Sequence, residues 1–211
     1  MPSRNLVRDF APDTYYHVYN RGVEKRTIFL DEQEYTVFLG LLKKYLTGHN
    51  HNPNNRHKRS STDLSAHASL LAYCLMPNHF HLLLYQKSEQ GVTQLLRRVS
   101  TGYAMYFNQR YKRVGGLFQS RFKASAINAD SYLHHISRYI HMNPKDYKTW
   151  PYSSFRYYDG TGKSATWLNT APILELFEND PNQYQTFLED YLDTKKELDE
   201  LKWQIANSDE V

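Results

Sequence analysis

The feature that most limits what this chain can fold into is a pair of short apolar segments only three residues apart. Residues 70–75 (LLAYCL) and 79–85 (HFHLLLY) have the composition of β-strands, and Met76-Pro77-Asn78 separates them. Proline cannot donate a backbone hydrogen bond to a sheet, and asparagine favours turns. A connection this short cannot join parallel strands. The chain is therefore expected to contain a β-hairpin in an antiparallel sheet.

Strand and helix patterns alternate on both sides of this hairpin. Residues 14–20 (TYYHVYN) are β-branched and aromatic, which is typical of a strand. Asp31 with Glu34 three residues later is the pattern of a helix N-terminus, and the apolar spacing that follows predicts a helix to about Leu46. Strands and helices mixed around a central hairpin predict an α+β fold, a small antiparallel sheet with helices packed on it. The further expected elements are a helix at 92–110, a strand at 121–127 and a helix at 132–141 that ends near Pro144.

Length and composition favour one domain with an appendage. The 211 residues are 40% hydrophobic, which is enough to bury a core. We expect the domain over residues 1–160, with a mobile polar insertion at 47–68, and an acidic helical extension over 161–211. Cys74 is the single cysteine, so neither an internal disulfide nor a multi-cysteine zinc site can form. The sequence has no apolar run of membrane-spanning length and no secretory signal, so we expect no membrane association and a cytoplasmic location.

Charge is distributed unevenly along the chain. Residues 1–174 hold 23 Lys and Arg against 11 Asp and Glu, whereas residues 175–211 hold 3 against 11. Residues 91–129 contain no acid and seven basic residues: Arg97, Arg98, Arg110, Lys112, Arg113, Arg121 and Lys123. The aromatic residues interleaved with them are Tyr103, Tyr106, Phe107, Tyr111, Phe118 and Phe122. Such a segment is typical of a groove for single-stranded nucleic acid, although the same charges would also suit an ordinary solvated surface.

His79 and His81 lie two positions apart in the second apolar segment of the hairpin. In a strand, side chains at i and i+2 point to the same face, so the two imidazoles would converge while Phe80 faces the core. Two convergent imidazoles are suited to one divalent metal ion. The alternative is a pair of unrelated histidines on the solvated face of a strand.

Tyr139 and Asn143 form a second candidate pair. At positions i and i+4 of a helix they would share one face, with the phenol one turn from the carboxamide. A phenol can act as a covalent nucleophile, and an amide oxygen is a hard ligand for Mg²⁺ or Mn²⁺. The chain has 18 tyrosines, so Tyr139 could equally be an ordinary side chain, and Asn143 before Pro144 could be a C-terminal cap.

Five segments, in this order along the chain, carry a resemblance to a known family. They are 16–22 (YHVYNRG), 75–83 (LMPNHFHLL), 116–123 (GLFQSRFK), 139–144 (YIHMNP) and 150–154 (WPYSS). Together they resemble the HUH (His–hydrophobic–His) single-tyrosine transposases, and among these the REP-associated tyrosine transposases. The polar insertion and the acidic segment near the C-terminus depart from the family pattern.

The resemblance implies a fold and a set of roles. The fold would be ferredoxin-like, a small antiparallel sheet with helices packed on it. His79, His81 and Asn143 would hold Mg²⁺ or Mn²⁺. Tyr139 would be the nucleophile of an enzyme that nicks and joins single-stranded or hairpin DNA through a 5′-phosphotyrosine link. The residues expected to contact this DNA are the seven basic residues above with Asn20 and Arg21.

Two other functions are compatible with the sequence. A non-cleaving protein of the same fold could bind structured nucleic acid, but it would have no need for the histidine pair, the tyrosine and the asparagine together. A hydrolase that activates water would want an acidic ligand or a general base, and the nearest acid to the basic segment is Asp130. The family includes monomers and homodimers, and the sequence does not decide between them. The acidic extension could cover the basic surface or be a solvated appendage.

Overall fold

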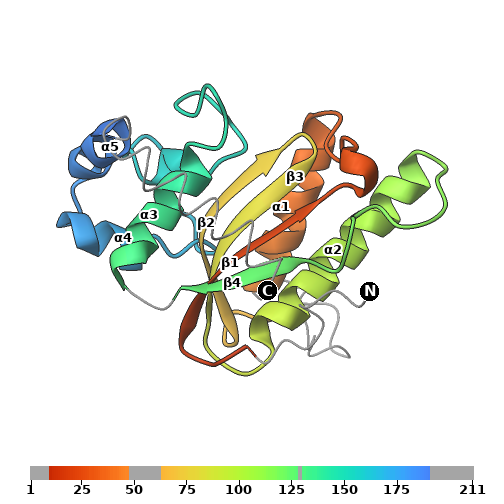
Figure 1. The fold of residues 1–211 in the computed structure, drawn as a ribbon, viewed down its shortest axis with the longest axis horizontal. Helices are drawn as coiled ribbons and strands as arrows, with labels where there is room; N and C mark the ends of the chain where they lie inside the picture. The colour runs from red at the N-terminus through yellow and green to blue at the C-terminus, as the bar shows by residue number, and fades with distance from the viewer. Residues whose placement is uncertain (1–9, 48–62, 128–129, 191–211) are drawn as a thin grey trace, which may run out of the picture.

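The computed structural model describes residues 10–47, 63–127 and 130–190, and in these residues the chain forms a four-stranded sheet. The strands are β1 (Thr14–Arg21), β2 (Ala68–Met76), β3 (His79–Gln86) and β4 (Lys123–Ile127). Their order across the sheet is β2-β3-β1-β4, and neighbouring strands are antiparallel. With α1 (Glu32–Leu46) after β1 and α2 (Gly91–Arg110) after β3, the element order is ferredoxin-like (Figure 1). The predicted α+β fold with an antiparallel sheet is confirmed.

Helices cover both faces of the sheet (Figure 1). On one face α1 and α2 bury a core with the alternate strand residues Val18, Phe80 and Leu82. The other face carries α3 (Asp130–His141), the short α4 (Ala171–Leu174) and α5 (Pro181–Glu189). Short 3-10 helices occupy Val23–Lys25, Phe155–Tyr157 and Glu175–Phe177. Because side chains alternate along each strand, the histidines of β3 lie on the face that carries α3.

The N-terminus of α1 forms as its sequence predicts. The Asp31 side chain accepts hydrogen bonds from the backbone amides of Gln33 and Glu34. In return, the Glu34 carboxylate accepts a hydrogen bond from the backbone amide of Asp31. This capping box satisfies amides that the first helical turn leaves without partners. Arg110 at the end of α2 also pairs with Asp31, so the two helices are joined at this corner.

The turn of the β2–β3 hairpin is fixed to the chain that leaves β1. The Pro77 carbonyl accepts hydrogen bonds from the amides of Ile28 and Phe29, at 2.7 and 3.0 Å, and the Asn78 carbonyl accepts from Gly22 at 2.9 Å. A Cβ at Gly22 would lie 2.3 Å from the Arg26 carbonyl oxygen, so only glycine fits this approach. The end of β1 and the start of β3 are therefore held together.

The outer edge of β2 is covered by the chain that follows α3. Hydrogen bonds join Leu75 to Tyr152, Ser154 to Tyr73 and Asn169 to Leu70, at 2.8–2.9 Å. An edge strand whose backbone groups are paired in this way is not available to another chain.

Segments on both sides of residue 160 contribute to the two cores. Leu168 is buried with the helices α1 and α2, while Ile173 and Tyr184 are buried under α3. The expected extension therefore packs on the sheet domain as far as residue 190, and its remaining residues lie outside the described ranges. Most of the polar insertion, residues 48–62, also lies outside them. In the described part of the chain, no helix has both the length and the apolar character needed to span a membrane.

Replacing Phe80 with alanine is expected to lower the free energy of unfolding by about 3–5 kcal/mol, because its ring is fully buried against Phe38 and Phe118. Met105→Ala is the matched control: this side chain is 67% exposed on α2, and its loss should change stability by less than about 0.5 kcal/mol. Urea denaturation measures both, and equal effects would contradict the position of the core.

Candidate active site

The pairing of β1 with β3 sets the geometry of the candidate site. In this register Tyr19 lies opposite His81, and Arg21 lies opposite His79. All four side chains point to the face that carries α3. The rings of His79 and His81 are 5.0 Å apart between centroids and perpendicular to each other. His81 is buried, whereas His79 is partly exposed at the end of its strand. The sequence prediction that the two imidazoles share a face is confirmed.

The Tyr139 ring lies against the histidines of the sheet within the same chain. Its centroid is 5.4 Å from that of His81, with the rings at 82°. Asn143 was expected on the same helix, but α3 ends at His141, and Asn143 lies in the turn that follows. This turn still brings the Asn143 Oδ1 atom to 3.3 Å from Nε2 of His79. The four candidate residues therefore meet in a single chain.

The contacts of His79 fit a cation between its ring and Asn143. The His79 Nδ1 atom lies 2.6 Å from Oδ1 of Asn78, whose amide nitrogen donates to the Lys25 carbonyl. A neutral imidazole carries one hydrogen, and this hydrogen is used when Nδ1 donates to Asn78. The Nε2 lone pair then faces the Asn143 oxygen at 3.3 Å, and adjacent ligands of one Mg²⁺ ion are roughly 3 Å apart. Two electron donors in this position fit a shared metal ion.

Burial keeps these histidines neutral, which is the form that binds metal. Burial, with a smaller contribution from the Arg21 charge, lowers the pKa of His79 to about 4. Burial also holds the pKa of His81 well below its usual value, and the positive charges that His17, His79 and Arg21 can carry act in the same direction. Among the described residues, no group of three or more His, Cys, Asp or Glu side chains is arranged to hold a metal ion. A metal here would therefore need the Asn143 amide as a third protein ligand.

Sequence reasoning missed one residue of this cluster, His17 on β1. Its Nε2 atom is 2.9 Å from Nδ1 of His81, and its ring centroid is 5.7 Å from that of Tyr139. The side chain is fully buried, and burial lowers its pKa to about 3. Alternation in the strand at 14–20 could have placed His17 on the same face as Tyr19. The pairing that brings it beside His81 could not be derived from the sequence.

Some of the predicted DNA-binding residues lie near the histidines. Arg21 is directly opposite His79, and Lys123 lies opposite Tyr19 with its ammonium 5.9 Å from that ring. Arg121 is exposed in the loop that leads into β4. Asn20 has a different position: it is 3% exposed, and its amide donates to the carbonyls of Ser120 and Arg121. Asn20 thus fixes the loop that carries Arg121.

The basic residues of α2 are not at this site, because α2 packs on the opposite face of the sheet. Arg110 forms an ion pair with Asp31, and Arg98 lies over the ring of Tyr45. Arg97 is exposed on the same helix, and Lys112 and Arg113 follow it. The expected single track of seven cations is therefore divided between two faces.

The interleaved aromatic residues mostly belong to the core, contrary to their expected role in a groove. Tyr103, Phe107 and Phe122 are at most 5% exposed, and Phe118 packs against the same core. Their spacing reflects the buried face of α2 and the start of β4. Stacking platforms for bases would need exposed rings.

A buried polar network holds α3 on the sheet. His141 contacts the Tyr184 hydroxyl through Nδ1 and the Ser154 hydroxyl through Nε2, at 2.6 and 2.7 Å. Tyr184 donates in turn to Ser137 at 3.0 Å. The helix that carries Tyr139 is thus tied to α5 and to the segment around Ser154 that covers the outer edge of β2.

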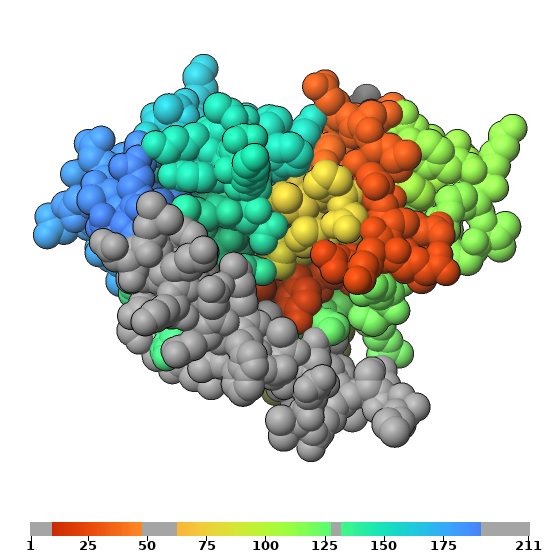
Figure 2. Space-filling model, turned by 45° about the horizontal axis from the view of Figure 1, so that its top comes forward, coloured from red at the N-terminus to blue at the C-terminus, as the bar shows by residue number. Residues whose placement is uncertain are grey.

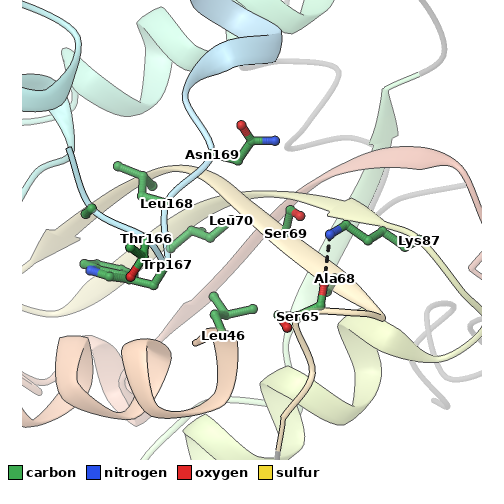
Figure 3. Close-up of a pocket in the computed structure, with 11 residues that line it drawn as sticks. Leu46, Ser65, Ala68, Ser69, Leu70, Lys87, Thr166, Trp167, Leu168 and Asn169 are labelled. Atoms are coloured by element: carbon green, nitrogen blue, oxygen red, sulfur yellow. Dashed lines mark hydrogen bonds between the residues drawn. The ribbon is translucent and has the colours of Figure 1, made fainter. Parts of the chain in front are cut away.

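The candidate site is separate from a cavity elsewhere on the sheet. The β2–β3 hairpin, in yellow, reaches the surface between the segment after β1 and the segment after α3 (Figure 2). A cavity of about 330 Å³ is lined by Ala68, Leu70, Lys87 and Trp167 (Figure 3). Ala68 pairs with Gln86, at the end of the hairpin opposite to His79. This cavity is therefore not part of the histidine–tyrosine cluster.

Comparisons with known proteins agree with the fold. A family model described as "Transposase IS200 like" matches residues 13–143. A Haemophilus influenzae protein, whose name marks it as a proposed REP-associated tyrosine transposase, is 31% identical over 101 residues. That match covers 40% of this chain and 57% of the relative, so the chain spans less than two-thirds of the relative's length. A solved structure of a REP-associated tyrosine transposase bound to a REP hairpin has a TM-score of 0.52 at 18% identity, covering 77% of this chain and 89% of the other.

The buried histidines predict a pH-dependent stability. Burial lowers the pKa values of His17 and His141 to about 3 and of His79 to about 4, whereas an unfolded histidine titrates near 6.5. Between pH 6.5 and 5 the unfolded chain takes up protons that the folded chain does not, so stability falls as the pH falls. Each such histidine contributes up to about 1.4 kcal/mol per pH unit.

Urea denaturation at pH 7.5, 6.5, 5.5 and 5.0 tests this expectation. The variant Asp31→Asn is the control, because the Asp31 pKa is already lowered by Arg110 and its carboxyl does not titrate in this range. It should leave the slope between pH 5 and 6.5 unchanged. A stability that does not change across this range would show that the histidines are not buried in neutral form.

Proposed function

This chain belongs to the family of IS200-like transposases, and from that membership we propose that it cuts and rejoins single-stranded DNA through a tyrosine nucleophile. The observation that carries the proposal is a set of two contacts between the sheet and the segment around α3. Tyr139 lies against His81, while Asn143 lies against His79. One contact joins α3, and the other joins the turn that follows α3, to the strand that carries the histidines.

The proposed nucleophile is the Tyr139 hydroxyl. Its oxygen attacks the phosphorus of a DNA phosphodiester, the bond from phosphorus to the 3′ oxygen breaks, and a 5′-phosphotyrosine link forms. The phenol loses its proton in this step, and the departing 3′ oxygen takes one up. The link keeps the energy of the original bond, so a 3′-hydroxyl can later attack it and restore a DNA strand without a nucleotide cofactor.

His79, His81 and Asn143 are the proposed ligands of Mg²⁺ or Mn²⁺. Bound there, the ion would act as a Lewis acid on the phosphate oxygens. The protein contributes position and charge. Burial keeps the imidazoles neutral, Asn78 orients the His79 ring, and the Arg21 guanidinium adds a positive charge beside the phosphate site.

We propose a DNA hairpin with an adjoining single strand as the substrate. The structural relative is bound to a REP hairpin, and this chain shares its fold. Arg21, Lys123 and Arg121 lie on or beside the histidine face, where they can neutralise backbone phosphates of the strand that is cut. The exposed cations of α2, Arg97 and Arg110, lie on the opposite face of the sheet, where a duplex stem could contact them.

Tyr139→Phe is expected to abolish covalent capture of a labelled hairpin oligonucleotide, because the ring remains but the attacking oxygen is lost. Binding of the same oligonucleotide should change less than about twofold in a gel-shift assay. Tyr132→Phe is the matched control, since Tyr132 is 47% exposed on the same helix. Denaturing gels separate three outcomes: an adduct supports the proposal, cleavage without an adduct indicates a hydrolase, and binding alone indicates a non-cleaving protein.

His79→Ala is expected to reduce cleavage in Mg²⁺ or Mn²⁺ by at least about 100-fold, because one of two imidazole ligands is lost. His67→Ala is the control, since this exposed histidine precedes β2 and contacts Ser88 outside the site. Chelation of the wild-type protein with EDTA should have the same effect as the His79 substitution. Full cleavage in EDTA would exclude a metal role for the pair.

A further inference from the structure

His17 is not one of the proposed metal ligands, but it contacts the ligand His81 directly. The two ring nitrogens, Nε2 of His17 and Nδ1 of His81, are 2.9 Å apart. The ring planes differ by 15° while their centroids are 5.1 Å apart, so the rings meet edge to edge rather than face to face. This is the geometry of a hydrogen bond in the plane of both imidazoles.

A hydrogen bond at Nδ1 decides which nitrogen of His81 can bind a metal. A neutral imidazole has one hydrogen and one lone pair, so a hydrogen on Nδ1 leaves the lone pair on Nε2. His81 is 5% exposed, and a buried N–H needs an acceptor. The His17 Nε2 atom is the acceptor placed to receive it.

On the basis of the proposed function, we infer that His17 is a positioning residue that accepts the Nδ1 hydrogen of His81 and so directs Nε2 of His81 to the metal. His17 itself is not a ligand in this arrangement, because its Nε2 lone pair is used by His81. Its other nitrogen, Nδ1, then carries the hydrogen of the neutral ring, and it is buried without a hydrogen-bond partner among the described residues. This unpaired donor costs free energy, so it is metal binding to His81 that selects this arrangement. The same ring also borders Tyr139, so one side chain fixes a wall of the nucleophile site and the orientation of a ligand.

The opposite direction of the hydrogen bond would prevent metal binding. If His17 donated to Nδ1 of His81, the hydrogen of His81 would lie on Nε2 and would block its lone pair. Each of the two arrangements holds two hydrogens on two neutral rings, so they differ in hydrogen position and not in charge. Metal binding therefore selects the arrangement in which His17 accepts.

The experiment measures Mn²⁺ binding to the DNA-free protein, by the loss of the electron paramagnetic resonance signal of free Mn²⁺. His17→Phe keeps the ring volume but removes the acceptor, and should weaken binding roughly 10- to 100-fold. His17→Gln places an amide oxygen near the position of Nε2, and should stay within about threefold of the wild type. Ser125→Ala is the control. Ser125 lies opposite His17 on β4, and its side chain forms no hydrogen bond to His17 or His81 in the described part of the chain.

A second measurement identifies the hydrogen directly. Nitrogen-15 correlation spectra of the Mg²⁺-saturated protein should show the His81 hydrogen on Nδ1 and a bare Nε2. A His17→Phe variant that folds and binds Mn²⁺ as the wild type does, or a His81 hydrogen found on Nε2, would overturn the inference. A wild type that binds no Mn²⁺ would also overturn it, while covalent capture of DNA by Tyr139 would still report on the nucleophile separately.

Discussion

The antiparallel pairing of β1 with β3 is the constraint on which the rest of the site depends. It places His17 diagonal to His81 and Arg21 opposite His79. The residues between them, Val18 and Phe80, enter the core under α1 and α2. A slip of one residue would exchange the two faces of the strand and move the polar side chains into the apolar core under α1 and α2. The hydrophobic core on one face therefore fixes the register of β1 and β3, and with it the positions of the polar side chains on the other face. The hydrogen bonds from the hairpin turn to the chain after β1 hold the same register.

Residues that follow the family match position α3, the helix that carries the proposed nucleophile Tyr139. That match ends at residue 143, yet α3 is tied down through His141 to Ser154 and Tyr184. Replacing either partner would leave a buried imidazole nitrogen unsatisfied, which is costly in a low-dielectric interior. The segment to residue 190 is thus structurally part of the domain, because the orientation of Tyr139 over the sheet depends on it.

The sequence predicted what depends on local pattern and missed what depends on pairing. The hairpin, the capping box of α1 and the shared face of His79 and His81 follow from turn chemistry and the two-residue period of a strand. The basic segment was misleading, because helical spacing does not reveal which face of the sheet α2 covers. Most of its rings proved to belong to the core, and the cations of α2 lie away from the histidines, whereas Arg121 and Lys123 lie on or beside the histidine face. His17 was missed because its partner is 64 residues away along the chain.

The charge of the site makes binding of the metal and binding of the DNA depend on each other. The proposed ligands are two neutral imidazoles and an amide, and Arg21 lies beside them with a positive charge. Neutral donors next to a guanidinium do not offset the charge of a divalent cation, since oppositely charged groups provide most of that stabilisation. A DNA phosphate would supply the missing negative charge to both the cation and Arg21. Metal and DNA are therefore expected to bind cooperatively, each raising the affinity for the other by the same factor. Through this coupling the metal would bind the DNA-free protein more weakly and would bind more tightly once a strand lies across the sheet beside Tyr139.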